Sequence, residues 1–333
     1  MTIIHNYTSI KQARLALVAS LGILMLSSAA SAQRTSTLAV DDQAQDAVNL
    51  YEVNGPALKL KKAVPAGKSP GRMCLDPAGA TLFVANAAGA QAIDLASQSP
   101  KASFTDSGIK QTFGCIVSRD NQKLYLADRD ANIIFVFSLA SHQLVKKIPG
   151  CDDVRYGIYA PDGKSLIFSC GSGSLAVIDP ATDTVKRTVK TVGMDPRGMV
   201  LTPDGKYLGV AMVSSDMVNW YHADTLELAS SFGVTRSPQG FVIAADGERA
   251  YVSGVYEGLI GVIDLREKNH EGEGEWRQSS SIPTGRAYSL DISPDGNYLY
   301  ASIADGAIAI VDLRSWKTLR VPLKGAGNLL YIK

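Results

Sequence analysis

Residues 157–163 read Gly-Ile-Tyr-Ala-Pro-Asp-Gly, a short β-rich run that leads into the turn signature Ala160-Pro161-Asp162-Gly163. In such a turn proline presets φ, aspartate bonds the backbone ahead of it, and glycine accepts a positive φ. Similar signatures occur at five other places in the chain: 76–79, 118–121, 202–205, 244–247 and 293–296. Each of them predicts a hairpin between two β-strands.

The signatures recur with a fixed period. Their fourth residues are numbers 79, 121, 163, 205, 247 and 296, which gives four steps of 42 residues and a last step of 49. An apolar run such as 82–85 follows each turn, then a third run such as 175–179 and a more polar fourth such as 184–189. Four antiparallel strands in each repeat are typical of a β-propeller blade.

The innermost strand of the repeat can be counted separately. It begins near residues 72, 114, 156, 198, 240, 288 and 327. The last copy, 328–332, has no blade of its own, so we expect it to complete a composite seventh blade with strands from 37–40, 48–53 and 58–62, which leaves no open sheet edge in the ring. The sequence therefore predicts an all-β fold, a seven-bladed β-propeller of four-stranded antiparallel blades.

The first 32 residues have the pattern of a signal peptide. Lys11 and Arg14 precede an apolar run, 15–26, which ends near Ala30-Ser31-Ala32. That run is shorter than the roughly 20 residues of a membrane span, and the small residues suit cleavage before Gln33. We expect residues 33–333 to form one exported domain, periplasmic or secreted; a retained N-terminal anchor is the alternative.

The charges of the chain nearly balance, with 33 Lys and Arg against 32 Asp and Glu. No overall field favours nucleic acid or an anionic membrane as a partner, so recognition must be local. With 46% hydrophobic residues, the chain has the composition of a globular protein. We expect a monomer without a membrane span after cleavage.

Two stretches carry a resemblance to a known group. Residues 82–86, Leu-Phe-Val-Ala-Asn, and 177–185, Val-Ile-Asp-Pro-Ala-Thr-Asp-Thr-Val, resemble the YVTN β-propeller repeat. The resemblance covers essentially all of 33–333 and implies a seven-bladed propeller of a kind often found in exported bacterial proteins. It also implies a broad class that includes amine-dehydrogenase-like quinoprotein subunits, haem d1 domains and lactonases.

The loops that lead into the inner strands are rich in arginine. Propellers bind ligands where these loops converge at the channel mouth, and several guanidinium groups there would hold a carboxylate or phosphate. The candidate ligand-binding residues are Arg72, Arg155, Tyr156, Arg197, Gln239, Arg286 and Tyr288. The alternative is that the arginines pair with nearby acids, Asp152, Asp153 and Asp195, and only hold the loops.

Four cysteines in an exported protein suggest disulfides. Cys151 precedes the third inner strand and Cys170 ends the next strand, so both should lie at one end of the same blade and are a candidate disulfide. Cys74 and Cys115 fall on neighbouring inner strands with opposite parity. They either face each other or remain two buried thiols, and we expect buried thiols.

No motif for metal, cofactor or nucleophilic catalysis is present, and we predict neither a metal nor a cofactor. His142, His222 and His270 fall on different parts of the repeat, so they do not predict a metal site. A haem d1 or lactonase-type site would place a histidine at the funnel, and none of the three maps there. This departure from the family counts against both activities.

The seven extra residues lie between Asp264 and Ser281, in an acidic, glycine-spaced stretch that carries Trp276. Such an insertion could contact a partner or weakly bind a cation; the alternative is a solvated hairpin extension. The leading functional hypothesis is a binding protein without demonstrable catalysis. It would take a small anionic molecule or an extracytoplasmic protein at the funnel or the insertion. The alternatives are a lactonase-type hydrolase or lyase and an accessory subunit of a periplasmic quinoprotein-type oxidoreductase.

Overall fold

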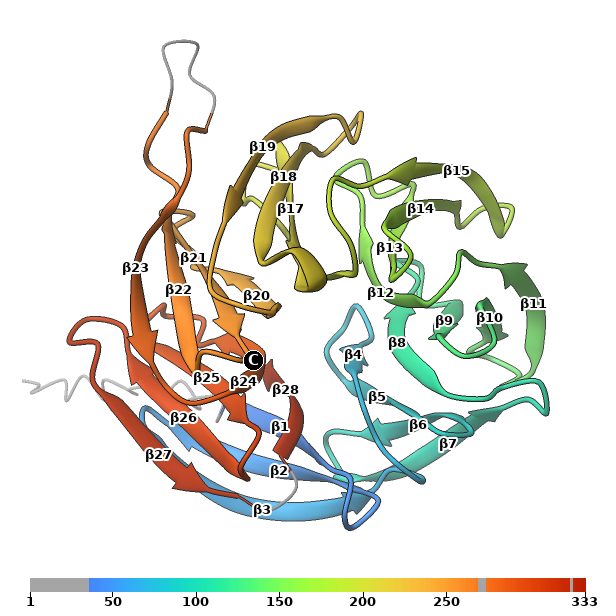
Figure 1. Ribbon diagram of the computed structural model, residues 1–333. Coiled ribbons are helices and arrows are strands. Elements are labelled where there is room, and N and C mark those ends of the chain that lie inside the picture. The colour runs from blue at the N-terminus through green and yellow to red at the C-terminus, as the bar shows by residue number, and fades with distance from the viewer. Residues whose placement is uncertain (1–35, 269–273, 324–325) are drawn as a thin grey trace, which may run out of the picture. The chain divides into compact units, whose positions relative to one another are not determined.

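The computed structural model describes residues 36–268, 274–323 and 326–333. All of them belong to one compact unit, Thr35–Lys333. They form seven four-stranded antiparallel sheets that stand around a central axis as the blades of a β-propeller (Figure 1). The predicted fold class is confirmed, whereas the expected signal peptide, 1–32, lies outside the described residues.

The blades are numbered from the first complete one. From the innermost strand outwards, blade 1 is β4 (Met73–Leu75), β5 (Thr81–Asn86), β6 (Gly89–Asp94) and β7 (Ser99–Thr105). Blade 2 is β8 (Thr112–Val117), β9 (Lys123–Asp128), β10 (Ile133–Ser138) and β11 (Leu144–Pro149). Blade 3 is β12 (Val154–Tyr159), β13 (Leu166–Cys170), β14 (Ser174–Asp179) and β15 (Thr184–Lys190).

The remaining blades repeat this order. Blade 4 is β16 (Pro196–Leu201), β17 (Tyr207–Met212), β18 (Met217–His222) and β19 (Leu228–Gly233), with a 3-10 turn, η1 (Val213–Ser215), before β18. Blade 5 is β20 (Pro238–Ile243), β21 (Arg249–Gly254), β22 (Leu259–Asp264) and β23 (Gln278–Pro283). Blade 6 is β24 (Ala287–Ile292), β25 (Tyr298–Ile303), β26 (Ala307–Asp312) and β27 (Thr318–Pro322). Blade 7 is β28 (Ala326–Ile332), β1 (Thr37–Asp42), β2 (Ala47–Asn54) and β3 (Ala57–Pro65).

The repeated turn signatures adopt the predicted conformation. In the turn between β12 and β13, the Gly163 amide donates to the Ala160 carbonyl at 2.9 Å, and Gly163 has a φ of +65°. Asn121 takes the same place in blade 2 with a φ of +56°. Because glycine and asparagine adopt positive φ more readily than other residues, each signature ends its hairpin without a clash.

Blade 7 joins the two ends of the propeller, as predicted. Strand β28 is its innermost strand and pairs antiparallel with β1 in the register Leu38↔Tyr331 (Figure 1). The Asp41 carboxylate strengthens this junction, because one of its oxygens accepts hydrogen bonds from the backbone amides of Gly327 (2.7 Å) and Asn328 (2.6 Å).

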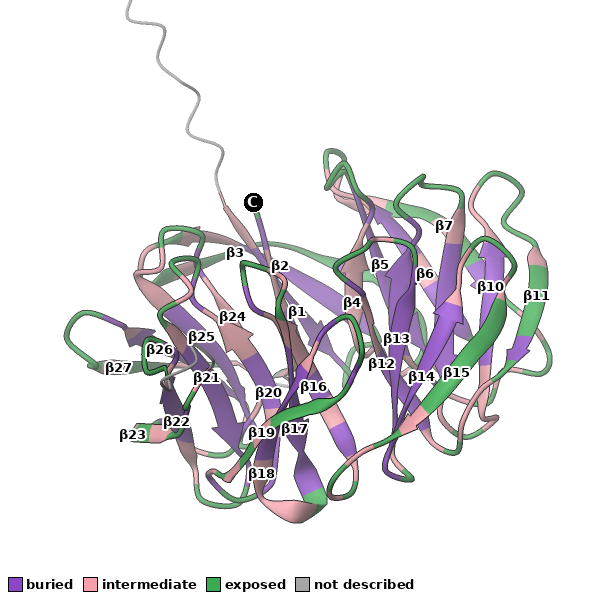
Figure 2. Cartoon of the chain, turned by 90° about the horizontal axis from the view of Figure 1, so that it is seen from above, coloured by how far each residue is buried: buried purple, intermediate pink, exposed green. Residues whose placement is uncertain are grey.

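The hydrophobic core is divided among the spaces between neighbouring blades. One cluster, for example, joins Tyr125 and Val136 of blade 2 to Phe168 and Ile178 of blade 3. The middle strands are therefore buried on both faces, whereas outer strands such as β11 and β15 are largely exposed (Figure 2). Within the described ranges, no helix has the length and apolar character that a bilayer crossing requires.

Both cysteine pairs are disulfides. Cys151 and Cys170 are joined within blade 3, as predicted, with their Cα atoms 5.8 Å apart. The expectation of two buried thiols at Cys74 and Cys115 is wrong, because they form a second disulfide with the same Cα separation. Neighbouring blades turn opposite faces of their sheets toward each other, so residues of opposite parity on β4 and β8 meet across the gap.

The insertion of blade 5 lies between β22 and β23, and its central residues, 269–273, are outside the described part. Trp276 does not face a partner, since its side chain is only 7% exposed. Its indole nitrogen donates to the Leu265 carbonyl at 3.0 Å, and its ring lies 4.5 Å from that of Trp220. Gly209 of blade 4 has no side chain, and Trp220 and Phe241 occupy the space beside it.

Candidate functional site

A cavity of about 710 Å³ opens where the loops leading into the inner strands meet. Of the predicted residues, Arg72, Gln239 and Tyr288 line it, from blades 1, 5 and 6. Its other polar and aromatic lining includes Gln43, Ser69, Gln111, Thr112, Phe113, Arg129, Asp130 and Asn328. The structure thus brings residues from loops far apart in the chain to one funnel, which we call the mouth cavity.

Arg72 occupies the base of the mouth cavity. It also lines a smaller cavity of about 120 Å³ further along the channel, together with Tyr156. The Arg72 guanidinium lies over the Tyr156 ring, 4.0 Å from its centroid, and its Nε has no hydrogen-bond partner. Among the described residues, no carboxylate forms an ion pair with Arg72, so the guanidinium is available to an anion.

Arg155 and Arg197 are instead engaged by acids, as the alternative interpretation of the arginines proposes. Arg155 donates to both carboxylate oxygens of Asp153, at 2.7 and 2.5 Å. Arg197 makes a similar fork to Asp195, at 3.0 and 2.9 Å, and also donates to the Gln239 amide oxygen at 3.1 Å. These two arginines stiffen the loops and position Gln239 at the rim of the mouth cavity.

Arg286 lies apart from the other predicted residues. Its side chain is exposed and its guanidinium is 6.0 Å from the centroid of the Tyr256 ring, in the turn between β21 and β22. It does not line the mouth cavity. Relative to the turn residues Gly79 and Gly296, the repeat equivalent of Arg286 is Ser69 rather than Arg72, and the Arg286 side chain points to the neighbouring blade.

Phe113 and Arg129 are contributors that the sequence did not single out. The guanidinium carbons of Arg129 and Arg155 lie 5.5 and 5.4 Å from the centroid of the Phe113 ring. That ring also meets Tyr156 edge to face, at 5.5 Å. The turn between β9 and β10, which carries Arg129, reaches the funnel because β9 runs antiparallel to the inner strand and ends where that strand begins. The antiparallel order of the strands could therefore have predicted from the sequence that the turn carrying Arg129 lies at the funnel.

The carboxylates around the funnel are poor general bases. Asp130, which lines the mouth cavity, receives a hydrogen bond from Arg129 at 2.8 Å, and this bond holds the pKa of Asp130 below its ordinary value. Burial raises the pKa of Asp41 to about 7 and that of Asp291 to about 6. Asp41 is fully buried and Asp291 accepts hydrogen bonds from the amides of Tyr331 and Ile292, so both fasten β28 rather than face a ligand.

The raised pKa of Asp41 predicts a pH-dependent stability. Folding favours the neutral carboxyl, so the free energy of unfolding should fall as the pH rises from the ordinary pKa of 3.8 to about 7 and then stay level. One such group gives a slope of at most about 1.4 kcal/mol per pH unit. Urea unfolding between pH 4.5 and 8 should show a shallower slope for Asp41→Asn. Asp246→Asn, in the exposed turn between β20 and β21, is the control, and an equal slope in all three proteins would contradict this role of Asp41.

The two histidines in the described residues lie away from the funnel. His142 and His222 are in or beside the turns between third and fourth strands of blades 2 and 4, and His270 lies outside the described residues. In the part of the chain that the structure describes, no three His, Cys, Asp or Glu side chains are placed to hold a metal ion. The arginine, amide and aromatic side chains that line the mouth cavity can bind anions and form hydrogen bonds.

Comparison with solved structures identifies relatives in fold. The periplasmic gluconolactonase of Pseudomonas aeruginosa is 16% identical, with 90% of this chain and 99% of that chain covered and a TM-score of 0.74. A putative 6-phosphogluconolactonase of Bacteroides fragilis is 14% identical, with coverages of 91% and 99% and a TM-score of 0.78. Hydrazine synthase of Kuenenia stuttgartiensis is 20% identical over 78% of this chain and 88% of that chain, with a TM-score of 0.67.

No protein-family model and no curated protein sequence matches the chain. At 20% identity and below, the solved structures establish a shared seven-bladed propeller fold and leave the chemistry to be argued from the residues.

Proposed function

We propose that this protein is an exported β-propeller that binds a small organic anion in the mouth cavity, with Arg72 as the principal contact to the carboxylate or phosphate group. The observation that carries the proposal is the Arg72 guanidinium, which stacks on Tyr156 at the base of the cavity without a carboxylate partner among the described residues. Arginine in such a position binds carboxylates and phosphates in a two-pronged geometry.

The rest of the lining suggests the body of the ligand. Gln43, Gln111, Gln239 and Asn328 provide amide groups that both donate and accept hydrogen bonds. Phe113 and Tyr288 provide flat apolar faces. This combination suits a hydroxylated organic acid, such as a sugar acid, better than a purely apolar one.

Binding is a better match than hydrolysis to the groups around the funnel. The accessible carboxylate, Asp130, has a lowered pKa, and the carboxyls with raised pKa values are occupied in the blade junction. A lactonase-type hydrolase is the second candidate, favoured by the names of the gluconolactonase neighbours. An accessory role in an oxidoreductase complex has only the hydrazine synthase neighbour in its support.

An extracytoplasmic location accords with the covalent structure. One disulfide links the inner strands of blades 1 and 2 and the other lies within blade 3, and such bonds persist in oxidising compartments. The gluconolactonase neighbour is named as periplasmic. Together with the N-terminal pattern, these features support export to the periplasm or the medium.

Substitution of Arg72 tests the proposal. With gluconate as the probe, Arg72→Ala should weaken binding measured by calorimetry by about tenfold or more, because a hydrogen-bonded charge pair is lost, and Arg72→Lys should retain part of the affinity. Arg314→Ala, an exposed arginine on a turn of blade 6, is the matched control. Gluconate binding that is absent, or equal in Arg72→Ala and wild type, would overturn the proposal. Turnover of glucono-δ-lactone that requires Arg72 would establish the hydrolase instead.

A further inference from the structure

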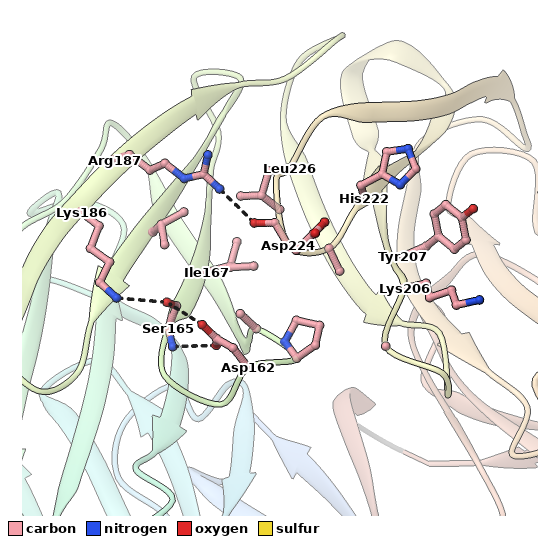
Figure 3. Close-up of a pocket in the computed structure, with 15 residues that line it drawn as sticks. Asp162, Ser165, Ile167, Lys186, Arg187, Lys206, Tyr207, His222, Asp224 and Leu226 are labelled. Atoms are coloured by element: carbon pink, nitrogen blue, oxygen red, sulfur yellow. Dashed lines mark hydrogen bonds between the residues drawn. The ribbon is translucent and has the colours of Figure 1, made fainter. Parts of the chain in front are cut away.

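A second cavity, of about 520 Å³, lies between blades 3 and 4. It is lined by the turn that follows β12 and by the turn between β18 and β19, so it opens at the strand ends away from the mouth cavity. We call it the interblade groove. Figure 3 shows Lys186 and Arg187 on one wall, Lys206 and His222 on the other, and Ile167 and Leu226 between them.

Between blades 2 and 3, and between blades 6 and 7, a tyrosine closes the corresponding space. Tyr125, at the centre of β9, extends its hydroxyl to the next blade, where it bonds the Pro180 carbonyl at 3.3 Å and Asp183 at 2.7 Å. Tyr300, at the same place on β25, donates to the Gly55 carbonyl of blade 7 at 2.8 Å. In blade 3 this position holds Ile167, which has no hydroxyl and is too short to reach across.

The other residues that take part in the polar contact of Tyr125 with blade 3 are also replaced at the groove. Lys123, which pairs with Asp183 at 2.7 Å, corresponds to Ser165 in blade 3. Asp183 corresponds to Leu226 in blade 4, since each donates its amide to the carbonyl four residues earlier at 2.8 Å, and each has a positive φ (+53° and +61°). Leucine adopts this conformation less readily than aspartate. Here it is 3% exposed and gives the groove an apolar floor.

Of the three cations on the groove walls, Lys186 lies 3.6 Å from Asp179 and Lys206 lies 3.9 Å from Asp204, which leaves Arg187 as the cation available to a ligand. Arg187 donates to the backbone carbonyl of Asp224 at 3.3 Å, and no carboxylate pairs with it among the described residues. The carboxylate of Asp162 accepts hydrogen bonds from its own turn, the amides of Lys164 (2.8 Å) and Ser165 (3.2 Å). Asp224 likewise accepts from the adjacent amide of Thr225.

We infer that the interblade groove is a second ligand site, which takes a small amphipathic carboxylate. The apolar body of the ligand lies over Ile167 and Leu226, and its carboxylate is held by Arg187. The volume suits a small molecule rather than a protein segment. Both an apolar floor and a cationic wall are required, so neither a neutral aromatic compound nor a small anion without an apolar body should bind well.

The test uses 2-naphthoate as the probe on the full exported chain. Wild-type protein should bind it saturably, with methyl NMR shifts concentrated at Ile167, Leu226 and Val177, and 2-naphthamide and acetate should bind at least about tenfold more weakly. Arg187→Ala should weaken 2-naphthoate binding by about tenfold. Ile167→Tyr, which restores the residue found in blades 2 and 6, should abolish binding while the protein keeps its thermal midpoint.

Two further variants separate this site from the funnel. Arg72→Ala should leave 2-naphthoate affinity unchanged, and Ile167→Tyr should leave gluconate affinity unchanged. The proposal for one site can therefore be rejected without affecting the proposal for the other. Arg314→Ala again serves as the matched arginine control. The inference is overturned if 2-naphthoate does not bind, if its shifts lie elsewhere, or if Arg187→Ala binds as wild type does. The Arg187 result decides the matter should Ile167→Tyr prove unfolded.

Discussion

Deletion of residues 326–333 is expected to abolish the native fold. The deletion removes β28, the innermost strand of blade 7, whose residues Leu329 and Ile332 are buried against neighbouring blades. It also removes both backbone amides that the buried Asp41 carboxylate binds, and it leaves β1 as an open edge. Because every junction between blades contributes to the closure of the ring, the truncated protein should show no cooperative thermal transition by circular dichroism, rather than a midpoint that is lower by a few degrees.

A circular permutant provides the control for this deletion. Placing 326–333 directly before residue 36, with the new C-terminus at 323, retains all strands and converts the β28 to β1 pairing into a hairpin. The register Thr37↔Ile332 leaves a short connection between these strands, as a hairpin needs. The permutant should unfold near the wild-type midpoint. A truncated protein that also unfolds cooperatively near that midpoint would show that blade 7 does not depend on β28.

Loss of the disulfides is expected to have the second-largest effect. By the loop-entropy relation, Cys151→Ser with Cys170→Ser should lower the free energy of unfolding by about 3 kcal/mol, for a sequence separation of 19. Cys74→Ser with Cys115→Ser, at a separation of 41, should lower it by about 4 kcal/mol. The second pair also links two blades and anchors β4, which has only three residues.

Urea unfolding under oxidising and reducing conditions measures both values. The reductant should destabilise the wild-type protein and each double variant, but not the protein that lacks all four cysteines. If Cys74→Ser with Cys115→Ser is as stable as wild type under oxidising conditions, the interblade disulfide does not contribute as we expect. A third pair of serine substitutions, at the exposed Thr182 and Thr184, controls for surface effects.

The candidate funnel was partly predictable. Repeat register alone located the loops that carry Arg72, Gln239 and Tyr288, because residues at equivalent positions of a ring converge on its axis. The register of the repeat does not indicate which arginines lack an acidic partner. That depends on whether an acid lies within reach in the folded loop, as Asp153 and Asp195 do for Arg155 and Arg197.

The second disulfide and the buried tryptophan were decided by contacts between blades. Cys74 and Cys115 lie on different blades, and their pairing follows from the way adjacent sheets face each other. Trp276 of blade 5 packs against Trp220 of blade 4, which itself lies beside Gly209, and the sequence does not show that these residues are neighbours. Local patterns carry no information on such cross-blade distances.

The period of 42 residues and its turn signatures were sufficient to determine the seven blades, the four strands of each, and the closure of the ring by residues 326–332, because each hairpin is specified by local turn chemistry and each strand by its own apolar run. The chemistry of the surface was decided by the tertiary structure. An unpaired Arg72 and an open groove at Ile167 result from which side chains meet across the channel and between blades, and those distances exist only once the ring has closed.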